Sequence, residues 1–333
     1  MKLLDTGYWT SKHFYWQSIY NIFCNGIQFK SLTFFSACNP AIDLGGMFFD
    51  RKTDIYQLLP SRYVPSTHIV SSFDLAIDFM RSNNLGFPVI VKPNVGLKGF
   101  KVSKIDNNDH LECFFKHSDV NDREWLIQEY LDYKKEFSLL YYRYPTTKKC
   151  GISSLVEKEY PFVTGNGYLT LKELIDNYKN SFLDKDNIYQ KFEEKLYEVP
   201  LNGEKIVLDF IGNYSRGAKF YSRMEFVNDS MIHYVSNVFK HVEGLNFFRI
   251  DFKANSLNDF LKGDFKVIEI NGMKSEPLHI YDPESNFLLN HGINKKHWNI
   301  IVGIVKEQQS RHIILPTFKQ GLESLISIRK MVK

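Results

Sequence analysis

The sequence has few cysteines, no long apolar run and little net charge, and each absence excludes a class of protein. Its four cysteines lie far apart and form no pair with metal-ligand spacing, so we expect reduced thiols in a cytoplasmic protein. No apolar stretch approaches the ~20 residues of a membrane span, and the N-terminus lacks the apolar segment of a signal peptide. The formal charge of +4 is too small and dispersed to favour nucleic acid, whereas a small anionic ligand would suit it.

Hydrophobic residues make up 44% of the 333 residues, enough for a buried core and two or three lobes. Helix and strand signals mix along the chain, so the predicted fold class is α+β or α/β. Residues 1 to about 45 are rich in aromatic side chains without a clean period. We interpret this part as a small N-terminal lobe whose aromatic residues form a core or the contact of a homodimer.

Capping residues mark several predicted helices. Three helices are expected to begin at Ser71 or Ser72, at Thr170 with Glu173 as its capping-box partner, and at Asp229 or Ser230. The tail from Trp298 to Lys333 is expected to form two more. Strands are predicted at residues 126–131, 136–142 and 206–211, and the last leads into a turn-rich, cationic loop at 212–219.

A glycine-rich hairpin is predicted between residues 89 and 105. The strand ending at Lys92 runs into the tip at 94–100, and Lys101–Ile105 returns as a second strand. Gly96 and Gly99 let backbone amides approach an anion closely, while Lys92 and Lys98 add positive charge, so a phosphate could be held here. The tip is not a Walker A sequence, because no Gly-Lys-Ser/Thr follows the glycines. A flexible surface hairpin would look similar.

Two further strands, 247–253 and 265–271, carry the strongest chemical signal. Side chains alternate between the faces of a strand, so Arg249 and Asp251 share one face of the first, and Glu269 and Asn271 share one face of the second. If the strands pair, three oxygen-bearing side chains converge beside one guanidinium, a chemistry for Mg2+ and phosphate rather than for zinc or iron. The alternative is two half-solvated strands with ordinary polar faces.

The order of these signals resembles the ATP-grasp superfamily over residues 48 to 285. The series consists of Lys52, a Pro65–Thr67 turn, the hairpin with Lys92, Gln128-Glu129-Tyr130, Arg249-x-Asp251 and Glu269-x-Asn271. The last two pairs look most like the D-alanine:D-alanine ligase branch, and residues 165–174 resemble a segment of cyanophycin synthetases. The chain differs from the D-alanine ligases in its short N-terminal lobe and in the Gly272-Met273 that follows Asn271, where those ligases have a Pro-Gly pair.

The resemblance implies an ATP-grasp fold in which the nucleotide is held between two β-sheet lobes. It divides the chain into an N-terminal lobe (1–66), a lid subdomain with the glycine-rich hairpin (67–128), a catalytic subdomain (129–300) and a C-terminal helical tail (301–333). The implied cofactors are ATP and Mg2+. The expected ATP contacts are Lys52, Lys92, Asn94, Gly96, Lys98, Gly99, Gln128, Glu129, Tyr130, Leu131 and Glu136. The expected Mg2+ ligands are Asp251, Glu269 and Asn271.

The implied activity is an ATP-dependent carboxylate-amine ligase that acts through an acyl phosphate and releases ADP and phosphate, with Arg249 and Lys92 as catalytic residues. Its expected partners are a small carboxylate and an amine, such as amino acids or a peptide, and neither nucleic acid nor a membrane. Substrate contacts are expected from Arg216, Lys219, Lys274, Ser275 and Glu276. Two alternatives stay open: a phosphotransferase acting on a small-molecule hydroxyl, and a nucleotide-binding regulator without chemistry.

Overall fold

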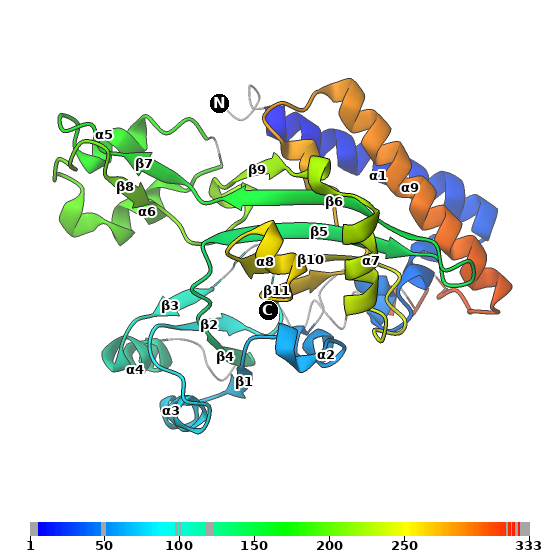
Figure 1. Cartoon of the computed structure of the whole chain (residues 1–333), viewed down its shortest axis with the longest axis horizontal. Coiled ribbons are helices and arrows are strands. Elements are labelled where there is room, and N and C mark those ends of the chain that lie inside the picture. Colours follow the sequence, from blue (N-terminus) through cyan, green and yellow to red (C-terminus); the bar gives the residue numbers. More distant parts are fainter. Residues whose placement is uncertain are drawn as a thin grey trace.

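A computed structural model describes residues 6–47, 51–96, 99, 101–117, 123–180, 182–317, 319–320, 322–323 and 326. Helices and antiparallel sheets mix along the described chain, which confirms the predicted α+β class. Figure 1 shows a long central sheet, a second sheet beside its edge and a pair of helices at the opposite side. Within the described residues, no helix is both long and apolar enough to cross a membrane.

The smaller of the two main sheets has four strands in the order β1-β4-β2-β3. Its strands are β1 (Thr67–Val70), β2 (Val89–Pro93), β3 (Ser103–Ile105) and β4 (Trp125–Glu129). Helices α3 (Phe73–Ser82) and α4 (Asn108–His117) pack on it around the buried side chains of Ala76, Leu111 and Trp125. Helix α3 begins where predicted, because the Ser72 side chain accepts a hydrogen bond from the amide of Leu75.

The larger sheet has five strands in the order β11-β10-β5-β6-β9. Its strands are β5 (Lys135–Arg143), β6 (Cys150–Glu159), β9 (Lys219–Ser222), β10 (Phe247–Ala254) and β11 (Lys266–Asn271). One face packs against α7 (Asp229–Val238), α8 (Leu257–Leu261) and the residues after α2 (Lys52–Gln57). The other face meets Trp298, Ile301 and the 3-10 helix Phe34–Cys38. These two clusters include residues of β5, β6, β10 and β11, whereas Phe220 of β9 packs in a separate cluster with Val156.

Two smaller parts complete the described chain. A two-stranded sheet of β7 (Phe162–Thr164) and β8 (Lys205–Val207) packs with α5 (Leu171–Asp176) and α6 (Lys185–Lys191). Helices α1 (Thr6–Phe29) and α9 (Phe287–Ser310) lie side by side (Figure 1). The capping box of Thr170 and Glu173 is present as predicted.

Several sequence predictions need correction. Helix α7 begins at Asp229 as predicted, but its cap is the preceding Asn228, whose side chain accepts from the amide of Met231. The strand predicted at 206–211 is limited to Lys205–Val207, and the helix predicted from Trp298 begins earlier, at Phe287. Most of the tail beyond residue 317 lies outside the described residues. The predicted boundary after residue 66 falls just before β1, whereas those after 128 and 300 fall inside β4 and α9.

Candidate active site

A cavity of about 440 Å³ lies between the four-stranded and five-stranded sheets. Its size is in the range of small-ligand pockets, ~300–1,000 Å³. The four-stranded sheet contributes side chains of β2 and β4, and the five-stranded sheet contributes side chains of β5, β6, β10 and β11. A site between two sheets is the arrangement that the resemblance predicted. The predicted residues that line the cavity are Lys52, Lys92, Gly96, Gly99, Gln128, Glu129, Tyr130, Leu131, Glu136, Arg249, Asp251, Glu269, Asn271, Lys274 and Glu276.

Two lysines supply positive charge at the side of the cavity formed by β2. The buried Lys92 Nζ donates to Gln128 Oε1 at 2.8 Å and to Tyr56 Oη at 3.0 Å, and neither partner carries a charge at neutral pH. Lys52 Nζ donates to the carbonyl oxygens of Pro93 and Asn94 at 3.1 and 3.3 Å. Burial lowers the pKa of both lysines to about 8, and the charge of Glu269 opposes this effect. An anion placed beside both ammonium groups would be strongly stabilised, because water screens them poorly.

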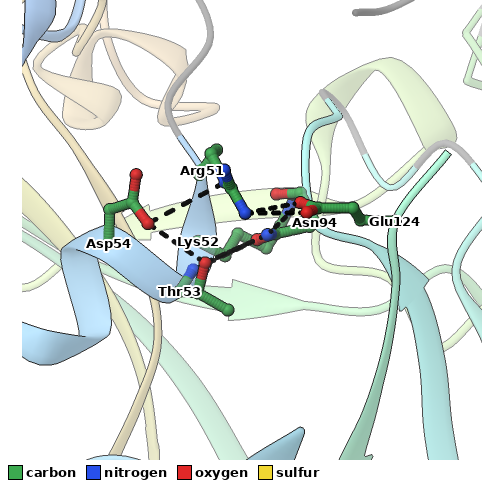
Figure 2. Close-up of polar contacts among 6 residues, drawn as sticks. All are labelled: Arg51, Lys52, Thr53, Asp54, Asn94 and Glu124. Atoms are coloured by element: carbon green, nitrogen blue, oxygen red, sulfur yellow. Dashed lines mark hydrogen bonds and ion pairs between the residues drawn. The ribbon is translucent and has the colours of Figure 1, made fainter. Parts of the chain in front are cut away.

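Contacts of Asn94 hold Lys52 at the cavity (Figure 2). The Asn94 side chain accepts from the amide of Thr53 at 3.1 Å and donates to Glu124 Oε2 at 2.9 Å, while its carbonyl accepts from the amide of Lys52 at 3.1 Å. These bonds tie the first turn of α2 to the loop after β2. Asn94 is fully buried and does not line the cavity, so the structure gives it a positioning role in place of the predicted ATP contact.

The central strand pair forms as predicted. β10 and β11 pair antiparallel, with Arg249 opposite Asn271 and Asp251 opposite Glu269. All four side chains reach the cavity, because directly opposed residues of two paired strands share one face of the sheet. A register shift follows Asp251, beyond the last of these pairs.

Asp251 is the centre of a buried charge network. One carboxylate oxygen accepts from Ser138 Oγ at 2.6 Å and from Arg249 Nε at 3.1 Å, and the other accepts from Lys158 Nζ at 3.0 Å. Lys158 Nζ also donates to Glu136 Oε1 at 2.8 Å. Burial acts to raise the pKa of Asp251, but the charges of Arg249 and Lys158 outweigh it and hold this pKa at about 2. Asp251 is therefore charged at neutral pH, as are Arg249 and Lys158, whose pKa values its charge raises against the effect of burial.

The oxygen-bearing side chains fit a magnesium-phosphate group. Among the described residues no three His, Cys, Asp or Glu side chains lie close enough together to hold a metal ion by themselves. The candidate ligands in the cavity are therefore two carboxylates, Asp251 and Glu269, together with the side-chain amide oxygen of Asn271. Oxygen donors of this kind suit Mg2+. The Nδ2 of Asn271 is buried and lacks a hydrogen-bond partner in the described structure, so it could donate to a phosphate oxygen.

The predicted adenine and ribose contacts line the cavity, but two of their side chains already have protein partners. Glu129 accepts from the amide of Ser66 at 3.1 Å. Both oxygens of Glu136 are occupied, because Lys158 Nζ donates to one and Tyr160 Oη donates to the other at 2.8 Å. Gly212 lies against this carboxylate, and a Cβ at Gly212 would come within 2.6 Å of Glu136 Oε1. This glycine is therefore required for the loop to approach the cavity.

The far end of the cavity is formed by Glu276 and two tyrosines. The Glu276 carboxylate accepts from Tyr15 Oη at 2.7 Å and from Tyr281 Oη. Burial and the charge of Glu276 raise the pKa of both hydroxyls, so both remain donors at neutral pH. Arg249 and Lys274 line the same cavity. A carboxylate and two cations are therefore available to a ligand that carries both signs of charge.

Three other described residues that were predicted to bind substrate do not line the cavity. Arg216 Nε donates to Asp209 at 2.6 Å and its Nη1 donates to the carbonyl of Gly99 at 3.3 Å. Ser275 is buried and donates to the carbonyl of Asn271 at 2.7 Å, whereas Lys219 is exposed at the start of β9. Direct substrate contact by these three residues is thus not supported by the geometry. Lys98 lies outside the described residues.

Sequence reasoning missed several residues that line the cavity, namely Ser11, Tyr15, Lys158, Lys253 and Tyr281. Lys158 could have been found from the alternation of β6, where it shares a face with the buried Ser154 and Val156. Tyr15 could not have been found in this way, because Glu276, its partner, lies 261 residues away along the chain.

Comparisons with known proteins were made at the level of families, sequences and solved structures. No family model matches the chain. A segment of 70 residues, 21% of this chain, is 34% identical to the coenzyme gamma-F420-2:alpha-L-glutamate ligase of Methanococcus maripaludis and covers 24% of that protein. The chain therefore spans about a quarter of the length of this curated relative.

Solved structures of ligases are also similar to the chain. The VanG D-Ala:D-Ser ligase from Enterococcus faecalis is 13% identical, with a TM-score of 0.44, over 79% of this chain and 62% of that one. The ATP-grasp ligase PsnB complexed with minimal precursor is 12% identical, with a TM-score of 0.42, over 76% of this chain and 59% of that one.

Proposed function

We propose that the chain is an ATP-dependent carboxylate-amine ligase. The observation that carries the proposal is one cavity with three kinds of group in it. These are the buried Lys92 of β2 with the half-buried Lys52 of α2, a carboxylate and amide cluster on β10 and β11, and Glu276 with its two tyrosine donors. The first two suit a nucleotide triphosphate with its metal, and the third suits an amine. No side-chain nucleophile is needed for this chemistry.

The proposed reaction has two displacements. A substrate carboxylate oxygen attacks the γ-phosphorus of ATP and ADP leaves, which gives an acyl phosphate. The nitrogen of an amine then attacks the acyl carbon, inorganic phosphate leaves, and the nitrogen loses its proton as the amide forms. Negative charge builds on oxygen in both steps, so fixed positive groups that face the cavity lower the barrier.

Each group of residues has a proposed role. Lys52 and Lys92 bind the phosphates, and Asp251, Glu269 and Asn271 hold Mg2+, which supplies charge neutralisation of the phosphates when bound. Arg249 is anchored by Asp251 at 3.1 Å, and so can face a developing oxyanion without turning away. A donor of this kind contributes about 3 to 4 kcal/mol of transition-state stabilisation. Lys158 bridges Glu136 and Asp251 beside it and adds a second cation.

The substrates are proposed to be zwitterionic, such as an amino acid or a peptide. Arg249 and Lys274 suit a carboxylate, and Glu276 suits an ammonium or amine group. We also propose a cytoplasmic location, which is supported by the four cysteines, all free in the structure.

Hydroxylamine trapping tests the reaction class. The protein is incubated with ATP, Mg2+ and hydroxylamine against panels of amino acids and small carboxylic acids, and ADP and hydroxamate are measured together. We expect ADP and a hydroxamate in equal amounts with at least one acid, because hydroxylamine intercepts an acyl phosphate. ADP with a stable phosphate ester of a hydroxyl compound and no hydroxamate would replace the ligase by a phosphotransferase. Arg249→Ala should suppress both products, whereas Arg62→Ala, remote from the cavity lining, should leave them unchanged.

A further inference from the structure

Helix α1 carries a straight row of large apolar side chains on its outer surface. Trp16, Tyr20, Phe23 and Ile27 are between 62% and 69% exposed, and we call these four residues the α1 stripe. Their spacings of four, three and four residues place them on one face of a helix. This is the spacing of the a and d positions of a coiled coil, whose partner is another helix.

The opposite face of α1 is firmly held by the rest of the protein. Phe14 is buried with its ring 5.6 Å from that of His297, and Asn294 of α9 donates to Gln17 at 2.7 Å. Trp298 donates to Ser18 at 3.3 Å. Helix α1 is therefore fixed to α9 through one face, and the α1 stripe lies on the face that points away from α9.

The apolar surface extends beyond the stripe. Trp9 and Ile19 of α1 are 55% and 59% exposed, and Phe287 at the start of α9 remains exposed while its ring lies 4.4 Å from that of His13, tilted by 47°. At about 200 Å² for one large side chain, the six apolar residues of α1 present about 700 Å² on one copy, close to the ~800 Å² per partner of a standard interface. Isolated exposed apolar residues need no explanation, but a contiguous area of this size marks a binding surface.

We propose that the α1 stripe is the interface of a homodimer, in which α1 of one copy packs against α1 of the other. Between Thr6 and Phe29 the only charged residue is Lys12, so a second copy brings almost no charge repulsion to the contact. A charged protein partner would find no complementary charge on this helix. Helices that lie on membrane surfaces carry a polar face rich in Lys and Arg, which α1 lacks. A twofold contact of the same patch with itself is also the commonest form of oligomer.

The oligomeric state of the full chain tests this proposal independently of any enzymatic activity. In sedimentation velocity at micromolar concentration, the wild-type protein should have twice the mass of one chain. The double substitution Trp16→Glu and Phe23→Glu places four carboxylates in the contact and should halve the mass. Leu201→Glu, at a residue that is 76% exposed near β8, is the matched control and should leave the dimer intact.

Three outcomes would overturn the proposal. A monomeric wild-type protein would overturn it whatever the variants show. If that monomer also co-floats with vesicles of phosphatidylcholine and phosphatidylserine, the α1 stripe binds a membrane surface instead. A dimer that persists in the double variant, with unchanged circular dichroism and thermal unfolding, would place the interface elsewhere. Loss of folding in the double variant is not expected, because both substituted side chains are exposed.

Discussion

Lys92 of β2 and Lys52 of α2 have pKa values of about 8, so their charge changes with pH in the range in which enzymes are usually assayed. Burial lowers the pKa of Lys52 and Lys92 to about 8, while Glu269 opposes the shift and Lys274 adds to it for Lys52. A bound triphosphate would raise both values, because a nearby opposite charge favours the protonated form. Binding of the nucleotide is therefore coupled to proton uptake above pH 8.

We predict that ATP binding weakens as pH rises from 7 to 9. Each lysine that must regain its proton costs about tenfold in the dissociation constant one pH unit above its pKa. The change is measured with a fluorescent ATP analogue at constant ionic strength. The double variant Lys52→Arg and Lys92→Arg is the control, since arginine keeps its charge throughout this range, and its affinity should stay constant. A wild-type affinity that is equal at pH 7 and pH 9 would contradict the prediction.

Asp251 and Glu269 are both proposed Mg2+ ligands, yet substitutions at the two should differ in their effect on stability. Asp251 is the shared partner of two buried cations, so Asp251→Asn leaves Arg249 and Lys158 with one carboxylate fewer. Among the described residues Glu269 forms no ion pair, but its charge favours the protonated forms of Lys52 and Lys92, so Glu269→Gln removes a weaker, longer-range stabilisation. We predict that both variants lose turnover, and that Asp251→Asn is destabilised more than Glu269→Gln, by about 3 kcal/mol relative to the wild type.

Urea unfolding and ADP release measured side by side check this prediction. Equal unfolding midpoints for the two variants would show that the network around Asp251 contributes little to the fold. Unchanged ADP release in both, at saturating ATP and Mg2+, would remove these residues from the proposed metal site.

At the scale of elements, the hairpin after β2 meets the loop that follows β8. Gly99 has a left-handed φ of 71°, and a Cβ there would come within 2.6 Å of Ile211 Cγ2. The carbonyl of Gly99 also accepts from Arg216 at 3.3 Å. Arg216, predicted to bind substrate, thus connects the hairpin to this loop, and both segments line the cavity.

We predict that Gly99→Ala weakens ATP binding by about 5- to 30-fold. The left-handed backbone costs about 1 to 2 kcal/mol with a side chain present, and the clash with Ile211 pushes the hairpin away from the cavity. Gly86→Ala is the matched control, because a Cβ there meets no atom within 4 Å. Isothermal titration with a non-hydrolysable ATP analogue measures both. The interpretation fails if the two alanine variants bind equally well.

The elements that the sequence predicted best are those with local signals. The pairing of β10 with β11 followed from period-two alternation, and the start of α5 followed from its capping box, since both depend on neighbouring residues. Helix α1 was not predicted, because its face toward α9 includes Gln17 and Ser18 while its outer face is aromatic. Because apolar residues also occupy the outer face, the sequence of α1 lacks the one-sided apolar pattern by which an amphipathic helix is recognised.

At the scale of the whole molecule, the packing of α1 against α9 brings α1 to the cavity. Ser11 and Tyr15 of α1 line its far end beside Glu276, which follows β11. No local pattern could have predicted this contact, because it depends on α1 packing against α9. This part of the site is thus built from α1, near the start of the described chain, and from residues that follow β11.

We predict that Tyr15→Phe raises the KM for the amine about tenfold and leaves ATP binding unchanged. The substitution removes one hydrogen bond to the Glu276 carboxylate, and a bond to a charged group is worth about 1.5 to 3 kcal/mol, less where water competes at a half-exposed side chain. A carboxylate that has lost one donor is also less fixed in position for an ammonium group. Tyr168→Phe, at a tyrosine that is 87% exposed and absent from the cavity lining, is the control. ADP release is titrated with the amine that supports it best, and ATP affinity is measured separately. If Tyr15→Phe weakens ATP binding as much as amine use, α1 shapes the cavity as a whole and Glu276 is not an amine site.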